Sequence, residues 1–229
     1  HNTLHYTYLN DDNKWVANSL GVGSATDVGL NTSLALNGFG DPIIGYRDLT
    51  ADDLKFARYL TPNWELTYIN PDIPAGFFTS TAWIDDYRPA IAFYDQKDAD
   101  LVYGKWNLIS RVWEFQKVDT TGDVGKYVSL AIDSGGNPHM SYYDATYGNL
   151  KYAYWNTVTQ SWNITPVDAA ADVGYYSSLA LDGSNRPYIS YYDKTNEQIK
   201  YAFKTIIDSW VSFPLEKVGV DGDGVIVSE

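Results

Sequence analysis

Short apolar runs separated by turn-forming residues recur along the 229 residues of the chain. The most regular series starts at Ser129 with SLAI, continues after a turn as PHMSYYD, and continues again as LKYA at Leu150. A closely similar series starts at Ser178 with SLAL and continues as PYISYYD and IKYA. Short alternating runs rich in aromatic residues are typical of β-strands, and helical periodicity is nearly absent. The pattern therefore predicts a repeated unit built from β-strands.

The repeat keeps a nearly constant register. A proline opens the second run of each unit, and successive prolines are 47, 49 and 49 residues apart, at Pro42, Pro89, Pro138 and Pro187. Six residues after each proline stands an aspartate, at Asp48, Asp95, Asp144 and Asp193. Aspartate favours turns because its side chain accepts hydrogen bonds from nearby backbone N–H groups. Each second run is therefore predicted to be a short strand that ends in a turn.

Each unit contains four such runs. The first run and the run opened by proline are separated by turn residues, as in Asp-Ser-Gly-Gly-Asn, which predicts a hairpin. The third run follows the aspartate and begins at Leu54, Leu101, Leu150 and Ile199. The fourth run begins with a tryptophan, at Trp64, Trp113, Trp162 and Trp210. The N-terminus supplies the second half of a unit alone, at Leu4 and Trp15.

Four short strands in a unit of this length are typical of a β-propeller blade, a twisted antiparallel sheet whose faces pack against neighbouring blades. We therefore expect an all-β, single-domain propeller with five blades of four strands, one of them split or incomplete between the N- and C-termini. The expected boundaries are a half blade at 1–20, blades at about 30–68, 78–119, 126–168 and 175–218, and a closing segment at 219–229.

The order of the SLALD, PYISYYD, LKYA and tryptophan elements resembles that of secreted and cell-surface bacterial β-propeller repeat proteins. The blades are similar to NHL-type and Asp-box-type repeats and to lectin-like propellers, over nearly the whole chain. The resemblance implies an extracellular or cell-surface location. It implies no particular activity, because the same blades serve lectins, scaffolds and hydrolases.

The C-terminus, VGVDGDGVIVSE, leaves the closure of the ring open. Val225 to Ser228 match the start of a first strand, and no second strand follows within these residues. One interpretation is a five-bladed ring with one imperfect blade. The other is a fragment that further residues, or a second copy of the chain, complete, because an open sheet edge tends to pair with another strand.

Composition excludes several classes of protein. The formal net charge of −13 and a pI of about 4.4 argue against nucleic acid, whose phosphates bind clusters of Lys and Arg. The absence of cysteine excludes disulfides and thiolate sites, and no apolar run has the length of a membrane span. The three histidines, His1, His5 and His139, do not form a recognisable nucleophile and base arrangement.

Antiparallel pairing places the loop that enters strand one and the loop between strands two and three on the same face of each blade. This acidic face would carry two sets of aspartates and one set of tyrosines. The first set, the candidate metal ligands, is Asp27, Asp123, Asp172 and Asp223. The second set, the candidate ligand-binding carboxylates, is Asp48, Asp95, Asp144 and Asp193, with Tyr46, Tyr94, Tyr143 and Tyr192 nearby.

The acidic face has two interpretations. Carboxylates bind Ca²⁺, and carboxylates beside aromatic rings bind sugars, so the face could hold calcium or a glycan. Alternatively, each aspartate caps its own turn and each tyrosine packs between blades. Calcium is the one cofactor that the sequence suggests.

The second unit departs from the repeat, since YINPDIPAGFFTSTAWIDDYRP replaces the usual turn and first strand. It brings acidic and aromatic residues close together in sequence, namely Asp72, Asp85, Asp86, Arg88, Phe77, Phe78 and Trp83. This could be drift in an unconstrained loop, or a specialised site. In an enzyme, paired glycosidase carboxylates would be sought here first.

The sequence favours a non-catalytic binding or adhesion module that recognises carbohydrate, because repeated weak sites gain avidity. One alternative is a glycan-active hydrolase or lyase with its site in the central depression, and another is a structural repeat of a larger surface protein. An enzyme would concentrate acidic groups in one blade, whereas a lectin would repeat its site.

Overall fold

The computed structural model describes residues 3–20, 27–69, 75–215, 218–220 and 226–228 as β-strands, turns and bends without a helix. Four antiparallel sheets of four strands follow one another along the chain, each in the order of the sequence. The described part of the chain holds no helix with the length and apolar character needed to span a bilayer.

Each sheet is one blade, numbered here from the N-terminus. Blade 1 comprises β3 (Val28–Leu36), β4 (Pro42–Asp48), β5 (Asp53–Leu60) and β6 (Asn63–Tyr68). Blade 2 comprises β7 (Ala75–Trp83), β8 (Pro89–Asp95), β9 (Asp100–Asn107) and β10 (Val112–Asp119). Blade 3 comprises β11 (Val124–Ile132), β12 (Pro138–Asp144), β13 (Asn149–Asn156) and β14 (Ser161–Asp168). Blade 4 comprises β15 (Val173–Leu181), β16 (Pro187–Asp193), β17 (Gln198–Lys204) and β18 (Trp210–Pro214).

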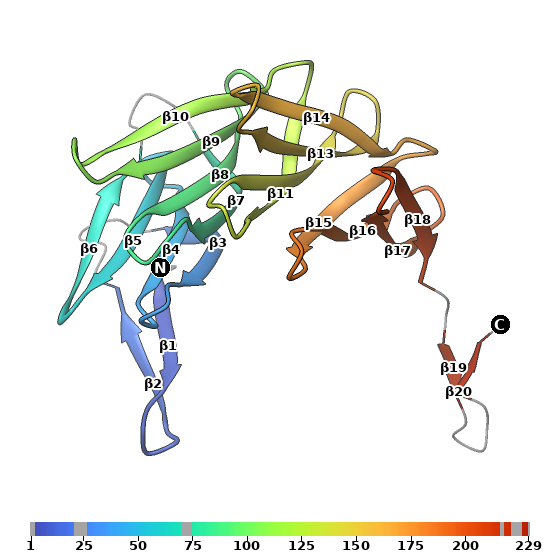
Figure 1. Ribbon diagram of the computed structural model, residues 1–229. Helices are drawn as coiled ribbons and strands as arrows, with labels where there is room; N and C mark the ends of the chain where they lie inside the picture. The colour runs from blue at the N-terminus through green and yellow to red at the C-terminus, as the bar shows by residue number, and fades with distance from the viewer. Residues whose placement is uncertain (1–2, 21–26, 70–74, 216–217, 221–225, 229) are drawn as a thin grey trace.

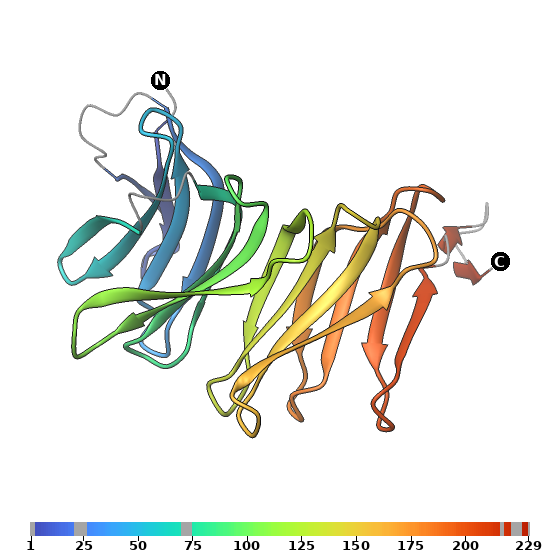
Figure 2. The same ribbon diagram turned by 90° about the horizontal axis from the view of Figure 1, so that it is seen from above.

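A two-stranded hairpin lies at each end of the chain. The N-terminal hairpin pairs β1 (His5–Leu9) with β2 (Trp15–Ser19), and the C-terminal hairpin pairs β19 (Val218–Val220) with β20 (Ile226–Ser228). The blades form an open arch between the two hairpins, which belong to separate sheets (Figures 1 and 2). This arrangement confirms an all-β propeller fold of four-stranded antiparallel blades, and the two hairpins at its ends do not pair with each other in the described residues.

The first strands of the four blades, β3, β7, β11 and β15, lie side by side on the concave side of the arch (Figure 1). A serine on each of the first three inner strands joins it to the next. The hydroxyl of Ser80 accepts a hydrogen bond from the backbone N–H of Leu130 at 3.0 Å, and Ser129 does the same for Leu179 at 3.0 Å. Ser33 accepts from the N–H of Thr81 at 2.9 Å. The inner strands are therefore held by a repeated side-chain bond.

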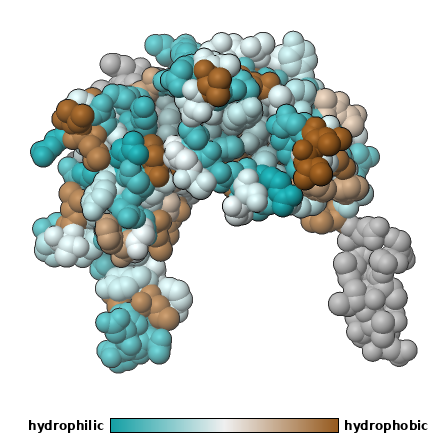
Figure 3. Space-filling model, viewed as in Figure 1, coloured by the Kyte–Doolittle hydropathy of each residue, from teal (hydrophilic) through white to brown (hydrophobic). Residues whose placement is uncertain are grey.

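Apolar side chains become buried where a neighbouring blade covers them. Leu130 of blade 3 is 7% exposed beneath blade 2, whereas Leu34, which has the same place in blade 1, is 54% exposed. At the other end, Leu150 of blade 3 is fully buried, but Ile199 of blade 4 is 48% exposed. Hydrophobic residues accordingly gather on the surface over β17 and β18 (Figure 3). Full burial of one such side chain stabilises the folded state by about 1.5–3 kcal/mol. Because these side chains are buried only where a second blade covers them, the contacts between blades make up most of the hydrophobic core.

Blades 3 and 4 each take a buried carboxylate from the blade before. Asp119, at the end of β10, accepts hydrogen bonds from Tyr142 and Lys151 of blade 3 at 2.8 and 2.5 Å. Asp168 in the same way accepts from Tyr191, at 2.6 Å, and from Lys200 of blade 4. These ion pairs compensate the cost of burying charge in the blade interface.

Candidate functional site

The turn that enters each inner strand is tied to the loop between strands two and three of its own blade. The backbone N–H of Asp123 donates to the hydroxyl of Thr146 at 2.7 Å, and its carbonyl accepts from the N–H of Ala145. Equivalent hydrogen bonds join Asp172 to Thr195 and Asp27 to Thr50. The two loops therefore lie together, as the antiparallel topology predicts. Asp223 lies outside the described residues.

The four aspartates that end strand two are buried turn caps. Asp144 is 1% exposed, and its carboxylate accepts from the backbone N–H groups of Thr146 and Tyr147 at 3.0 and 3.2 Å. The other three also accept from backbone N–H groups of their turns, namely Asp48, Asp95 and Asp193. A ligand approaching the face would reach these carboxylates only by opening the turns, so we leave them out of the candidate site.

Two of the predicted tyrosines connect consecutive blades. The hydroxyl of Tyr94 in blade 2 donates to Asp123 of blade 3 at 2.8 Å, and that of Tyr143 in blade 3 donates to Asp172 of blade 4 at 2.7 Å. Burial, together with these carboxylates, raises the pKa of both phenols well above the usual value. Both hydroxyls therefore stay protonated at neutral pH and act as hydrogen-bond donors.

The remaining two tyrosines differ in position. Tyr192 occupies the place of Tyr143 in blade 4 and is half-buried. Tyr46 stands two residues before its aspartate rather than one, so its side chain projects from the opposite face of the sheet. It is fully buried, and its hydroxyl has no hydrogen-bond partner among the described residues. Tyr46 therefore lies apart from the other three, and Arg47 occupies their position in blade 1.

Each inner strand carries an irregularity near its start. In blade 3, Val124 pairs with Asp144 and Ser129 pairs with Ser141. The chain advances five residues along β11 but only three along β12 between these pairs, so β11 contains two extra residues. Such β-bulges bend the strand and redirect side chains. One bulge residue in each blade has a positive φ, near 50°, at Asn31, Phe78, Tyr127 and Tyr176. A bulky side chain rarely adopts this conformation, which costs about 1–3 kcal/mol.

Aromatic residues of the bulges, together with two tyrosines of the adjacent second strands, form a row of rings that crosses three blades, which we call the inner-strand row. Its members are Phe77, Phe78, Tyr94, Tyr127, Tyr143, Tyr175 and Tyr176. Tyr127 is central, because its ring centroid lies 4.4 Å from that of Phe78, 5.3 Å from Tyr175 and 4.6 Å from Tyr176. Tyr175 lies 4.4 Å from Tyr143. The rings therefore pack in one continuous series, in which Tyr176 is 68% exposed, Phe78 and Tyr127 are half-buried, and Tyr94 and Tyr143 are buried.

Paired charges border the row. Lys126 forms an ion pair with Asp123 at 2.5 Å, and Lys194 with Asp172 at 3.6 Å. The two carboxylates are 38% and 36% exposed, so solvent reaches them. At the blade 1 end, the guanidinium of Arg47 lies 3.6 Å from the ring centroid of Phe77. The row therefore presents hydrogen-bond donors and acceptors with little local net charge.

The irregular second unit contributes its aromatic residues and not its described acidic residues. Phe77 and Phe78 belong to the row, but Asp85 and Asp86 lie in the β7–β8 loop, at the other end of the inner strand. Asp85 accepts from the backbone N–H of Tyr87 at 2.9 Å, and Asp86 accepts from that of Gly38 at 2.7 Å. Asp72 lies outside the described residues.

The sequence interpretation missed Tyr127, Tyr175 and Tyr176. A signal was present, because an aromatic residue stands two places after the turn glycine in three of the four blades. Within the described residues, no three His, Cys, Asp or Glu side chains come together as metal ligands. Calcium binding stays an expectation of the sequence.

Comparisons with known proteins support the architecture. The arabinofuranosidase of Fusarium graminearum is 11% identical over 90% of this chain and 70% of its own, with a TM-score of 0.60. An ulvan lyase, named as a new family of polysaccharide lyase, is 15% identical over 95% and 69%, with a TM-score of 0.57. The AofleA protein of Arthrobotrys oligospora is 13% identical over 82% and 59%, with a TM-score of 0.58.

This chain thus spans 59% of the AofleA chain and about 70% of the two enzymes. At these identities the likeness shows the fold, a β-propeller, and nothing finer. No protein-family model and no curated protein matches the sequence.

Proposed function

We propose that the inner-strand row binds a glycan chain. The observation that carries the proposal is the continuity of the aromatic surface from Phe78 through Tyr127 to Tyr176. Aromatic rings stack on the apolar faces of sugar rings, and polar groups beside them fix the hydroxyls. The pairs formed by Asp123 with Lys126 and by Asp172 with Lys194 supply those polar groups.

The charge distribution favours a neutral glycan. The whole chain carries a formal net charge of −13, which repels a polyanion at long range. At the row itself each exposed carboxylate is paired with a lysine. These ion pairs carry no net charge that would attract an ionic ligand. The carboxylate of each pair can still accept hydrogen bonds from neutral hydroxyl groups, and the ammonium group can donate them.

Glycan cleavage is the second candidate function. Two similar structures carry the names of a polysaccharide lyase and an arabinofuranosidase, which favours a glycan-active enzyme over a purely binding module. In this chain the candidate proton donor is Tyr143, whose hydroxyl donates to Asp172 at 2.7 Å and whose side chain is 6% exposed, so a substrate would have to displace the neighbouring groups to reach it. An extracellular or cell-surface location accords with either function.

Binding is tested with a panel of neutral oligosaccharides, namely xylo-, manno-, arabino- and cello-oligosaccharides, by isothermal titration calorimetry. We expect at least one to bind, and Tyr127→Ala to weaken it at least tenfold. Tyr87→Ala is the control, since Tyr87 is 62% exposed on the β7–β8 loop, away from the row. Binding that is absent from the whole panel, or that survives in Tyr127→Ala unchanged, contradicts the proposal.

Cleavage is measured separately with the corresponding polysaccharides and with ulvan. Hydrolysis releases new reducing ends, and elimination gives an unsaturated product that absorbs ultraviolet light. If the protein is an enzyme, Tyr143→Phe should lower turnover at least a hundredfold while the affinity for oligosaccharide changes little. Turnover that is equal in Tyr143→Phe and wild type would remove Tyr143 from the chemistry.

A further inference from the structure

Hollows recur at the junctions between consecutive blades, at the end of the blades opposite the inner-strand row. Four of them share the same framework. Each is lined by the proline that opens strand two of the following blade, namely Pro42, Pro89, Pro138 and Pro187. Each is also lined by the residue five places after the start of the third apolar run, namely Tyr59, Trp106, Trp155 and Lys204. The hollows are therefore equivalent positions of the repeat.

The hollow between blades 2 and 3 is the largest of the four. It measures about 430 Å³, whereas the hollows before blade 1 and before blade 4 measure about 230 and 220 Å³. Small-molecule sites usually measure about 300–1,000 Å³. The junction of blades 2 and 3 therefore has room for a small ligand.

The walls of this hollow combine aromatic rings with paired charges. The ring centroid of Trp162 lies 5.5 Å from that of Tyr103 and 5.3 Å from that of Trp155. Lys105 and Glu114 form a long ion pair at 3.8 Å, and their side chains are 46% and 44% exposed. A ligand can therefore meet an aromatic surface together with a donor and an acceptor that carry no net charge.

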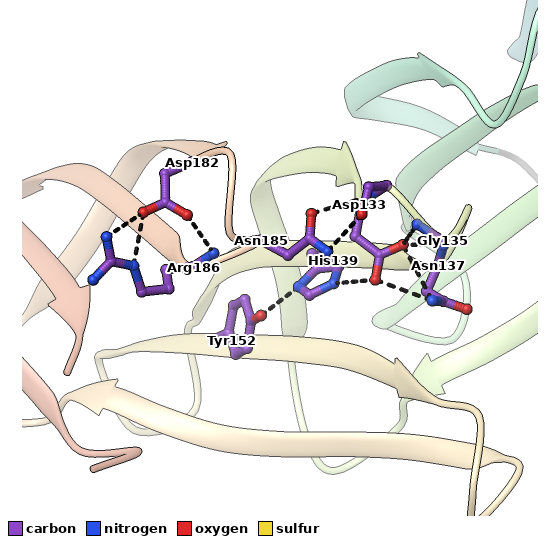
Figure 4. Close-up of polar contacts among 9 residues, drawn as sticks. Asp133, Gly135, Asn137, His139, Tyr152, Asp182, Asn185 and Arg186 are labelled. Carbon is purple, nitrogen blue, oxygen red and sulfur yellow. Dashed lines mark hydrogen bonds and ion pairs between the residues drawn. The ribbon is translucent and has the colours of Figure 1, made fainter. Parts of the chain in front are cut away.

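The loop that forms one wall is held in place before any ligand arrives. The carboxylate of Asp133 accepts hydrogen bonds from the backbone N–H groups of Gly135 and Asn137 at 2.8 and 2.7 Å (Figure 4). From blade 4, the side chain of Asn185 bonds to the backbone and hydroxyl of Ser134 at 3.1 and 2.8 Å. The wall is preorganised, which reduces the entropy lost on binding.

The equivalent hollow at the junction of blades 1 and 2 is almost completely filled by side chains of the protein, and its remaining volume is about 10 Å³. Arg58 there takes the place of Lys105, and its guanidinium lies 5.5 Å from the ring centroid of Trp106. It also forms an ion pair with Glu65, the equivalent of Glu114, at 2.6 Å. A planar polar group of the protein thus occupies, at this junction, the space that is open at the next one.

We propose that the hollow between blades 2 and 3 binds one neutral sugar residue, with its ring against Trp155 and its hydroxyls on Lys105 and Glu114. The flat guanidinium over Trp106 at the filled junction indicates which shape and polarity the framework accepts. This site lies at the end of the blades opposite the inner-strand row and does not depend on it.

The experiment uses the methyl glycosides of glucose, galactose, mannose, xylose and fucose, observed by saturation-transfer NMR and calorimetry. We expect wild type to bind at least one of them, and Lys105→Arg to weaken that binding at least tenfold, because an arginine paired with Glu114 would fill the hollow. Glu114→Gln should weaken it as well. Thermal unfolding checks that each variant is folded.

The reverse variant gives an independent readout. Arg58→Ala should open the hollow between blades 1 and 2 and raise the number of methyl glycosides bound per chain. Tyr127→Ala, which tests the inner-strand row, should leave this binding unchanged. The proposal is overturned if no methyl glycoside binds wild type, if Lys105→Arg and Glu114→Gln both bind as well as wild type does, or if Tyr127→Ala alone abolishes binding.

Discussion

The hydroxyl of Tyr142 donates a hydrogen bond to the carboxylate of Asp119, 2.8 Å away and in a different blade. Asp119 is the last residue of β10 in blade 2, and Tyr142 lies in the second strand of blade 3. Lys151 of blade 3 completes the cluster at 2.5 Å. Since all three side chains are shielded from water, the cluster links the two blades electrostatically as well as by apolar contact.

Removing one member of this cluster should destabilise the protein strongly. Asp119→Ala leaves the ammonium of Lys151, whose side chain is 13% exposed, without its closest carboxylate. We expect a loss of about 3–5 kcal/mol in the free energy of unfolding, measured with urea. Asp98→Ala, which removes an exposed partner of Lys117, is the control and should change little. An equal effect of both substitutions would contradict the prediction.

Replacing the whole cluster should cost much less than breaking it. In the register of the sequence repeat, the residues that correspond to Asp119, Tyr142 and Lys151 one unit earlier are Asn70, Phe93 and Val102. We therefore expect the triple variant with Asp119→Asn, Tyr142→Phe and Lys151→Val to recover most of the stability lost in Asp119→Ala, because no ammonium group stays buried without its carboxylate. Asp144 loses its 3.3 Å ion pair with Lys151 in this variant, but it keeps the backbone hydrogen bonds of its turn, as Asp95 does in blade 2. A triple variant less stable than Asp119→Ala would refute this account.

The inter-blade carboxylates should make folding sensitive to acid. Burial alone would raise the pKa of Asp119, but hydrogen bonds from Lys151 and Tyr142 outweigh it and lower the pKa below its ordinary value of 3.8. The pKa of Asp168 is lowered for the same reasons by Lys200 and Tyr191. This stabilisation is present above the unfolded-state pKa and is lost as the pH falls through the lower, folded-state pKa. Urea titrations on either side of pH 3.8 should show the loss, and Asp119→Asn should show less of it.

His139 should contribute a separate acid-linked loss at higher pH. Burial lowers the pKa of this histidine below its ordinary value of 6.5, and the hydrogen bond with Asp133 opposes the shift only in part. Between the folded pKa and pH 6.5 the unfolded chain binds the proton and the folded protein does not, so stability falls as the pH falls through that interval. An NMR titration of the His139 ring that gives a pKa above 6.5 would contradict this prediction, and His139→Gln should flatten the stability profile there.

The glycine that follows each inner-strand turn should resist substitution. Gly125 has a φ of +105°, and a Cβ atom on it would lie 2.9 Å from Cα of Leu101 in the preceding blade. Gly125→Ala must therefore shift backbone against backbone, and we expect it to lower the melting temperature by several degrees. Gly183→Ala is the matched control, because nothing lies within 4 Å of its added Cβ. Similar melting temperatures for the two variants would show that the junction yields easily.

Strand order and the shared loop face could be predicted because they follow from local sequence. Pro138 and Asp144 mark the ends of β12 exactly where the spacing places them. Antiparallel pairing then puts the turn of Asp123 beside the loop of Thr146. Both inferences need only the alternation of side chains along a strand and the direction of the next strand.

The chemistry of the face could not be predicted in the same way. Asp144 and Asp123 are both aspartates in turns, yet the first is buried and the second is partly exposed. Tyr46 and Tyr143 both stand near the end of a proline-opened strand, but Tyr46 is four residues after Pro42 and Tyr143 is five after Pro138, and this one step places their side chains on opposite faces of the sheet. The contact between Tyr127 and Tyr176 joins the bulges of two blades. The hollow lined by Lys105 and Pro138 also lies between two blades. Neither feature could be predicted from one repeat, because each depends on contacts between two.

The crossing of the blade boundary by Asp119 affects how such a chain could be rearranged. A segment cut at the sheet boundaries of blade 3 would carry Tyr142 and Lys151 away from their carboxylate and would take Asp168 away from Lys200. A segment that begins at Asp119 and ends just before Asp168 would keep Asp119 together with Tyr142 and Lys151. The next segment would likewise keep Asp168 together with Lys200. The unit that can be duplicated, deleted or shuffled without loss is therefore offset from the visible sheet and begins in the last strand of the preceding blade.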